Sequence, residues 1–488
     1  FGAADLRTPH MDSLAASGVR FTQFYAAPVS SASRASLLTG QFTRRAGLTG
    51  NAGYTGLPLG KETLAERMRD NGYRTACIGK WHLGSWKEYA PNSRGFDYFW
   101  GFLGGCIDSY SHFYYWGGPN RHDLWRNGEE IHEEGKFFAA ETLREAEEFI
   151  LRDGDDRPFF LYWAVNIPHY PLQPAKKWLD HYADLPAPRR MYAAFVSTFD
   201  DYLGRLRAFL RERGLEENTL VILQSDNGHS TEVRTFGGGG YCGDYRGGKF
   251  SLFEGGIRVP AIVSWPGHLP QGETRDQTAM NIDWFPTILE LCGLDASGID
   301  VDGRSLVPLL RDASEKSPHD VLHFDFERQW AVRQGDWKLL CNAIDVRPDD
   351  RNETLEGLYL TNLGIDPTES ENLLGEYPEK AQELLKLRDD IRKRTDRPPR
   401  RSASPESLDL RQIDVAELQR TALALQGDVA PGVHPAALVL QHAVDINRDA
   451  VALADHFGLV PFAGGFLRSA AHAFFDRNAA LRRFDPGH

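Results

Sequence analysis

Three short polar clusters each follow a predicted strand, and their side chains could bind and cleave an anionic ester. They are Gly79-Lys80-Trp81-His82, Pro168-His169-Tyr170-Pro171 and Ser225-Asp226-Asn227-Gly228. Because the carboxyl ends of parallel strands meet at one edge of a sheet, we expect the clusters to share a crevice there. Lysines and histidines suit an anionic substrate, and an aspartate beside an asparagine suits a hard cation.

Each cluster alone also has a purely structural explanation. Asp226-Asn227-Gly228 is an ordinary turn sequence, and a histidine between prolines, such as His169, is more often structural than catalytic. The combination favours chemistry, because complementary polar groups rarely follow three strands by chance.

A glycine-rich segment, Gly243 to Lys249, matches most of a nucleotide-binding P-loop. Phe250 stands where a P-loop needs Ser or Thr for magnesium, and no clear strand precedes the segment. We therefore predict a glycine loop that delivers Lys249 to an anion.

A serine-rich stretch, Ser30-Ser31-Ala32-Ser33-Arg34, precedes Ala35 to Gly40. By itself it predicts a loop entering a helix whose first turn is capped by serine side chains.

Alternating helix-like and strand-like segments must position these groups. The predicted strands cover 73–78, 158–166, 219–224 and 259–265, and the predicted helices 61–70, 141–151, 192–212 and 283–291. This order predicts an α/β domain at 1–315, with a largely parallel sheet flanked by helices.

The pattern of predicted helices and strands changes after this domain. Strand-like runs at 321–326, 330–340 and 355–360, followed by a helix at 378–394, predict a smaller α+β subdomain at 316–394 with an antiparallel sheet. Residues 395–405 form an Arg-, Pro- and Ser-rich linker. The alanine-rich remainder, 406–488, contains no lysine and is expected to be a helical extension.

Composition narrows the class of protein. The 488 residues carry a formal net charge of -13, which argues against nucleic-acid or anionic-membrane partners. No apolar run is long enough to span a membrane. The five cysteines form no C-x-x-C pair, so neither a disulfide framework nor a cysteine zinc site is expected. Cys77 and Cys292 lie in hydrophobic runs and are expected to be buried thiols.

Taken together, the motifs resemble those of the formylglycine-dependent (type I) sulfatases of the alkaline phosphatase superfamily. Residues 30–40 resemble the signature C/S-x-P/A-S-R, which is followed by a short helix ending in T-G. GKWHLG at 79–84, PHYP at 168–171, SDNG at 225–228 and GGKFSLFEGGIRVP at 247–260 resemble its further motifs in the same order. The opening stretch at 7–26 is also similar, and the resemblance covers roughly residues 1–390.

The resemblance implies an alkaline phosphatase-like fold and a role for each matching residue. Residue 30 would be oxidised to formylglycine, whose hydrated aldehyde is the nucleophile, and Arg34 would hold it in place. Asp226, Asn227 and residue 30 would bind one calcium ion. Lys80, His169 and Lys249 would contact the sulfate, and His82 would lie beside the aldehyde hydrate. Either His169 or Lys249 would protonate the departing alcohol.

The resemblance also implies partners and a location. The substrate would be a sulfated carbohydrate, such as a glycosaminoglycan or algal polysaccharide fragment, or an aryl sulfate. A formylglycine-generating or maturase enzyme would modify residue 30. A periplasmic or secreted location is expected.

Two features depart from the family pattern. Most members have Cys at the first signature position, so Ser30 indicates either the bacterial serine-type branch or a Cys→Ser substitution. The family's first strand carries two adjacent aspartates that complete the metal site, and near the start of this chain Asp5 stands alone. We therefore expect the domain at 1–315 to lack this first strand and half of the cation ligands, to bind calcium weakly and to be inactive.

The substrate-binding candidates come mainly from an aromatic stretch at 100–126. They are His112, Tyr115, Arg121 and His122, with Tyr170 from the PHYP motif. Aromatic faces beside polar groups suit a sugar ring, but a packed surface loop explains the stretch equally well. Two other functions stay open: a phosphoester or phosphonate hydrolase of the same superfamily, and a non-catalytic carbohydrate-binding protein.

Overall fold

The computed structural model describes residues 2–115, 120–152, 156–235, 237–347 and 351–395. The described residues belong to one compact unit. The predicted extension at 406–488 lies outside the described residues, as does the predicted linker apart from Thr395, which ends helix α11 (Pro378–Thr395).

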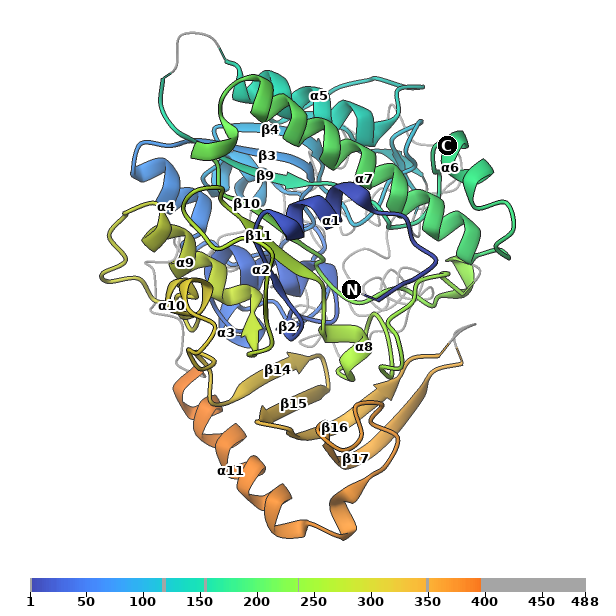
Figure 1. The fold of residues 1–488 in the computed structure, drawn as a ribbon, viewed down its shortest axis with the longest axis vertical. Coiled ribbons are helices and arrows are strands. Elements are labelled where there is room, and N and C mark those ends of the chain that lie inside the picture. Colours follow the sequence, from blue (N-terminus) through green and yellow to red (C-terminus); the bar gives the residue numbers. More distant parts are fainter. Residues whose placement is uncertain (1, 116–119, 153–155, 236, 348–350, 396–488) are drawn as a thin grey trace, which may run out of the picture. The chain divides into compact units, whose positions relative to one another are not determined.

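A five-stranded sheet with the order β8-β7-β4-β3-β9 forms one half of the α/β domain. Strand β3 (Arg74–Lys80) is buried throughout and pairs in parallel with β4 (Tyr98–Phe102) and β9 (Phe159–Ala164). Strands β7 (Trp125–Arg126) and β8 (Glu129–Glu130) continue it as an antiparallel hairpin. Helices α5 (Phe138–Ile150) and α7 (Arg189–Glu212) cover one face (Figure 1), and α4 (Leu64–Asp70) packs on the other.

A four-stranded sheet with the order β10-β11-β1-β12 forms the other half. Its strands are β10 (Val221–Gln224), β11 (Ala261–Ser264), β1 (Val19–Phe21) and β12 (Glu273–Arg275). β11 runs antiparallel to both of its neighbours. Helix α9 (Trp284–Leu291) packs on this sheet from one side and α1 (Pro9–Ala16) from the other. The α/β class is therefore confirmed, with its strands divided between two mixed sheets.

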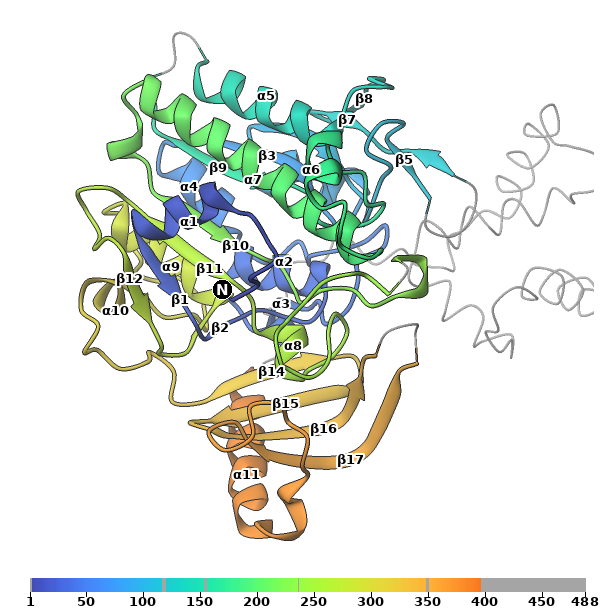
Figure 2. The ribbon, with the colours of Figure 1, turned by 45° about the vertical axis from the view of Figure 1, so that its right-hand side comes forward.

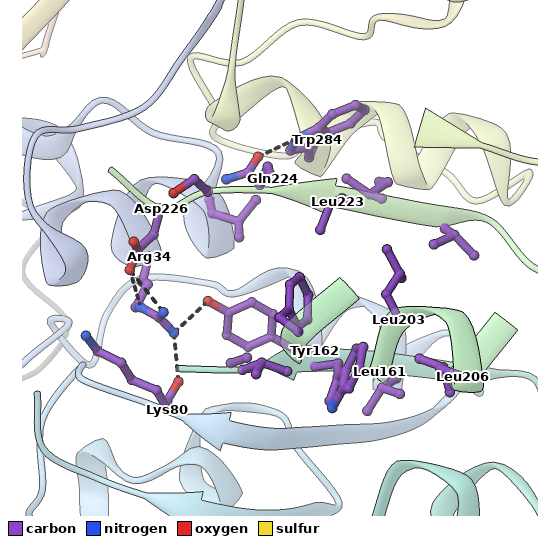
Figure 3. Close-up of a pocket in the computed structure, with 18 of the residues that line it drawn as sticks. Arg34, Lys80, Leu161, Tyr162, Leu203, Leu206, Leu223, Gln224, Asp226 and Trp284 are labelled. Carbon is purple, nitrogen blue, oxygen red and sulfur yellow. Dashed lines mark hydrogen bonds and ion pairs between the residues drawn. The ribbon is translucent and has the colours of Figure 1, made fainter. Parts of the chain in front are cut away.

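The two sheets meet across a cavity of about 840 Å³. β9 and β10 are edge strands on either side of it, and Leu161, Leu203 and Leu223 form part of its apolar lining (Figure 3). Both strands are apolar in sequence, yet both are largely half-buried because each borders this cavity. The parallel pairing at β3 and β9 consequently does not continue to β10.

The predicted antiparallel subdomain is confirmed. Strands β14 (Leu322–Phe326), β15 (Gln329–Gln334), β16 (Trp337–Asp345) and β17 (Glu353–Asn362) pair in chain order. Helix α11 packs against one face (Figure 1). The fully buried Lys338 amine lies 2.9 Å from both Glu254 and Glu369, which ties β16 to helix α8 (Glu254–Ile257) of the α/β domain.

The predicted helices occur with shifted ends. α4 begins at Leu64 because Thr63 and Glu66 form a reciprocal capping box, and α7 begins three residues before its predicted start at 192. The remaining elements are α2 (Ser30–Thr39), α3 (Thr43–Ala46), α6 (Lys176–His181), α10 (Val307–Arg311), β2 (Phe24–Tyr25), β5 (Phe113–Tyr114), β6 (Arg121–His122) and β13 (Ala279–Met280).

All five cysteines are free thiols. Cys77 is fully buried as predicted, whereas Cys292 is half-buried beside the core around α9. Within the described ranges, no helix has both the length and the apolar surface that a bilayer crossing requires.

Candidate active site

Ser30 is the first residue of α2, and its hydroxyl is almost completely buried in a polar network. Ser30 Oγ donates to Asn227 Oδ1 at 3.1 Å and accepts from Lys80 Nζ at 3.1 Å. Ser31 Oγ donates to the His82 carbonyl oxygen at 2.7 Å. The helix N-cap is Val29, with no side-chain capping bond, so the predicted serine capping is wrong. The side chains of Ser30 and Ser31 bond to residues of the strand-end clusters instead.

Arg34 connects two of the strand-end clusters (Figure 3). Its Nε and Nη2 donate to Asp226 Oδ2 at 3.1 and 3.0 Å. Its Nη1 donates to the Lys80 carbonyl oxygen at 2.8 Å and to the Tyr162 hydroxyl at 3.2 Å. Burial acts to raise the pKa of Asp226, but the charges of Arg34 and Lys80 outweigh it and lower the pKa to about 2. Asp226 is therefore ionised at neutral pH.

Two buried lysines bring positive charge to the same pocket. Lys80 ends β3 and is 2% exposed, and burial, reinforced by the charge of Arg34, lowers its pKa to about 7. Burial also lowers the pKa of Lys249, against the pull of Glu232, whose Oε2 lies 3.4 Å from its Nζ. Both amines are held where desolvation makes an incoming anion favourable.

Two histidines lie beside these lysines. His169 lines the cavity, and its Nδ1 lies 2.8 Å from the Tyr170 carbonyl oxygen. His82 has a left-handed backbone with φ 58°, and Gly105 packs so tightly against its ring that a Cβ there would lie 2.8 Å from Nε2. Burial, together with the lysine charges, holds the pKa of both histidines well below the usual value. Both imidazoles are therefore neutral at pH 7.

The structure thus brings together residues from segments far apart in the chain. The residues that line one cavity are Ser30, Arg34, Lys80, His169, Tyr170, Asp226, Asn227 and Lys249. His82 lies close enough for the charges of Lys80 and Arg34 to lower its pKa. The predicted convergence of the three clusters is observed.

Sequence reasoning missed Glu232, which contacts two residues that line the cavity, Tyr170 and Lys249. Its carboxylate accepts from the Tyr170 hydroxyl at 3.2 Å and pairs with Lys249 and Arg234. Burial acts to raise the pKa of Glu232, but Lys249 and the hydroxyl donors lower it overall. Glu232 follows no predicted strand and belongs to no motif, so the sequence carried no signal for it.

The oxygen ligands of a calcium ion are only partly present. Asp226, Asn227 and Ser30 contribute a carboxylate, an amide oxygen and a hydroxyl, which are the ligand types that calcium prefers. Calcium takes about six to eight oxygens, and Asp226 Oδ2 already accepts two bonds from Arg34. These three residues fit calcium in ligand type but fall short in number.

The five substrate-binding candidates separate into two groups. Tyr170 lines the cavity, and the Tyr115 hydroxyl donates to its carbonyl oxygen at 2.8 Å. His112 is fully buried with Nε2 3.1 Å from the Lys136 carbonyl oxygen, so its predicted contact with substrate is corrected. Arg121 stacks on Tyr114, and His122 faces Glu130. Neither belongs to the cavity lining.

An α/β fold with buried cationic side chains around a serine hydroxyl suits a hydrolase of anionic esters. Family comparisons give the class. The family model described as "Sulfatase" matches residues 1–294, and one described as "N-sulphoglucosamine sulphohydrolase, C-terminal" matches residues 248–396.

Individual relatives support the same family. The chain is 32% identical to Arylsulfatase A from Homo sapiens over 79% of this chain and 82% of that protein. It is 34% identical to N-acetylgalactosamine-6-sulfatase from Sus scrofa over 64% of this chain, and the match spans 62% of that relative's length. The crystal structure of Ps i-CgsB in complex with k-i-k-neocarrahexaose superposes with a TM-score of 0.70 at 28% identity, covering 81% of this chain and 88% of that one.

The chain therefore belongs to the sulfatase family. Its class of activity is sulfuric ester hydrolysis.

Proposed function

We propose that the chain hydrolyses sulfate monoesters on a sulfated carbohydrate, such as a glycosaminoglycan or algal polysaccharide fragment. The observation that carries the proposal is the set of buried cations, Arg34, Lys80 and Lys249, in the pocket that holds the Ser30 hydroxyl. The substrate class is supported by a relative named for N-acetylgalactosamine 6-sulfate and by a similar structure that contains a neocarrahexaose.

Residue 30 acts as the nucleophile in this proposal after its oxidation to formylglycine by a maturase or formylglycine-generating enzyme. As a hydrated aldehyde it would supply one hydroxyl for attack on sulfur and another whose deprotonation releases sulfate. An unmodified serine has no second hydroxyl and should stall after one turnover. The Ser30 side chain already lies between Lys80 and Asn227, at the centre of the charged groups.

One calcium ion is proposed beside residue 30, held by Asp226 and Asn227 with further oxygens from outside this set. A bound cation would screen the repulsion between an anionic ester and its nucleophile.

The side chains of the site can perform the remaining tasks. Lys80 and Lys249 stabilise charge on the sulfate oxygens in a desolvated pocket. Lys249 is better suited than His169 to protonate the departing alcohol, because His169 is neutral at pH 7 while Glu232 helps Lys249 keep its proton. We assign removal of the proton from residue 30 to the neutral His82, whose buried Nδ1 has no hydrogen-bond partner among the described residues.

A phosphoester or phosphonate hydrolase is the second candidate, because the same cations would also bind phosphate. The two are separated by rates on matched aryl sulfate and aryl phosphate esters, measured on chain co-expressed with a maturase. The shortage of calcium ligands is expected to keep turnover low. Sulfate release should still be the faster of the two reactions, and the peptide that contains modified residue 30 should be about two hydrogens lighter than the same peptide with serine.

Two variants complete the experiment. Lys249→Met should abolish turnover. Lys177→Met, which removes an exposed lysine paired with Asp201 on the outer surface, should retain it. Faster phosphate release would transfer the proposal to the second candidate. No release of either anion from chain with a modified residue 30 would leave the carbohydrate-binding function.

A further inference from the structure

A second cluster of ligating side chains lies outside the Ser30 pocket. His122, Glu130 and His132 each offer one ligand atom, and these atoms all lie within 4.8 Å of one another. We propose that these residues, called the His122 cluster below, bind one divalent transition-metal ion, and that zinc matches them best. The proposal does not depend on the sulfatase reaction.

Two antiparallel strand pairs, β5–β6 and β7–β8, carry the cluster; β5, β7 and β8 are labelled in Figure 2. His122 ends β6 and pairs with Phe113 of β5, while Glu130 ends β8 of the β7–β8 hairpin. The segment that follows, with His132, is held at both ends: Ile131 N–H donates to the Leu124 carbonyl oxygen at 2.9 Å, and Gly135 N–H to that of Tyr110 at 2.7 Å. Backbone hydrogen bonds therefore place the ligands before any ion binds.

The side chains already face one another. His122 Nδ1 lies 3.0 Å from Glu130 Oε1, and the rings of His122 and His132 stack with centroids 4.3 Å apart. Glu134 adds a second carboxylate, whose Oε1 lies 2.9 Å from His132 Nδ1. A carboxylate at this position orients a ligating imidazole.

The His122 ring is held between two carboxylates. Its side chain is only 6% exposed, and its two ring nitrogens face two carboxylates, Nδ1 facing Glu130 and Nε2 facing Glu134 at 3.9 Å. An imidazole nitrogen that carries a lone pair can bind a metal ion. The buried Nε2 makes no hydrogen bond in the described structure. A metal ion held by the ring and the carboxylates would balance their negative charge.

The donor set selects the metal. Two imidazoles and a carboxylate suit zinc and its transition-metal neighbours, whereas calcium and magnesium prefer oxygen ligands alone. Tetrahedral zinc with bonds of roughly 2.0–2.2 Å places its ligand atoms about 3.4 Å apart. Glu130 and His132 have side chains that are 40% and 61% exposed, so both can move the remaining distance.

Binding here would stabilise a loop that backs the Ser30 pocket. Asp123, next to His122, accepts from the backbone N–H groups of Leu103 and Gly104 at 3.1 and 2.8 Å. The adjoining Gly105 packs against the His82 ring. We therefore expect zinc to raise the thermal midpoint of the folded chain.

The test titrates zinc chloride into the chelator-treated full chain by calorimetry, with metal content measured after dialysis. His132→Ala changes an exposed ligand and should fold normally, and Glu130→Gln should weaken zinc binding at least tenfold. The control is His268→Ala, which removes an exposed histidine stacked on Trp265 in a separate loop.

We expect wild type and His268→Ala to bind one more zinc ion per chain than His132→Ala, and the zinc-induced rise in thermal midpoint to disappear in His132→Ala. Zinc bound by cysteines or by histidines elsewhere is common to all variants and cancels in the difference. Equal zinc stoichiometry and affinity in His132→Ala and wild type would overturn the proposal.

Discussion

Replacing Arg34 by methionine should destabilise the folded chain through Asp226. The guanidinium makes two bonds to Asp226 and one each to the Lys80 carbonyl oxygen and the Tyr162 hydroxyl. It is a main cause of the lowering of the Asp226 pKa from 3.8 to about 2, a shift of about 2 kcal/mol for a carboxylate that is 28% exposed. Because these four hydrogen bonds are lost and the Asp226 carboxylate loses its guanidinium partner, we expect the free energy of unfolding to fall by about 3–5 kcal/mol.

The assay is urea denaturation in chelator of wild type, Arg34→Met, Asp226→Asn and the double variant. We expect a coupling energy of about 2 kcal/mol, because the asparagine has no charge to leave unpaired. The contribution from Asp226 ionisation is present above its unfolded pKa of 3.8 and is lost as pH falls toward about 2. Arg34→Met should therefore lose stability less steeply across that window. Strictly additive single-variant effects would refute the reasoning.

Three further predictions follow from buried charges and ligand counts. Lys338→Met leaves Glu254 and Glu369 buried without their shared cation, and urea denaturation should show a loss of about 3–5 kcal/mol; a loss below about 1 kcal/mol would contradict this. In the folded chain Lys80 is charged below its pKa of about 7, and burying this charge lowers the stability of the fold. The loss of stability disappears as pH rises toward 10.5, the pKa of Lys80 in the unfolded chain. Lys80→Met should therefore unfold at pH 6 at no lower temperature than wild type, while losing turnover of aryl sulfate; a lower midpoint argues against this. Calorimetry should detect calcium binding with a dissociation constant no lower than about 10⁻⁴ M, since Asp226, Asn227 and Ser30 supply only three oxygens. A dissociation constant near about 10⁻⁶ M would show that further ligands take part.

Much of the site could be predicted from the sequence, because each polar cluster directly follows a strand and the end of that strand determines where the cluster lies. The apolar run through β3 and the parallel partner β9 place Lys80 and His169 at one edge, and the run through β10 brings Asp226 to the same cavity. The pairing of β10 could not be predicted, because an apolar run does not reveal which neighbour a strand chooses or in which direction.

Side-chain direction in the loops was harder to predict. The aromatic stretch at 100–126 suggested sugar contacts, but composition does not determine which way a loop residue points. His112 turns into the core, and His122 turns toward the β7–β8 hairpin. Glu232 was missed because only the tertiary fold brings it to Lys249.

The central claim is that distant segments gather their cations into one pocket for a tetrahedral oxyanion. Isothermal titration with inorganic sulfate tests it without requiring turnover or a modified residue 30. We predict one sulfate per chain in wild type and in Lys177→Met, with binding lost in Lys249→Met. Absence of saturable binding in wild type, or equal affinity in wild type and Lys249→Met, would contradict the account.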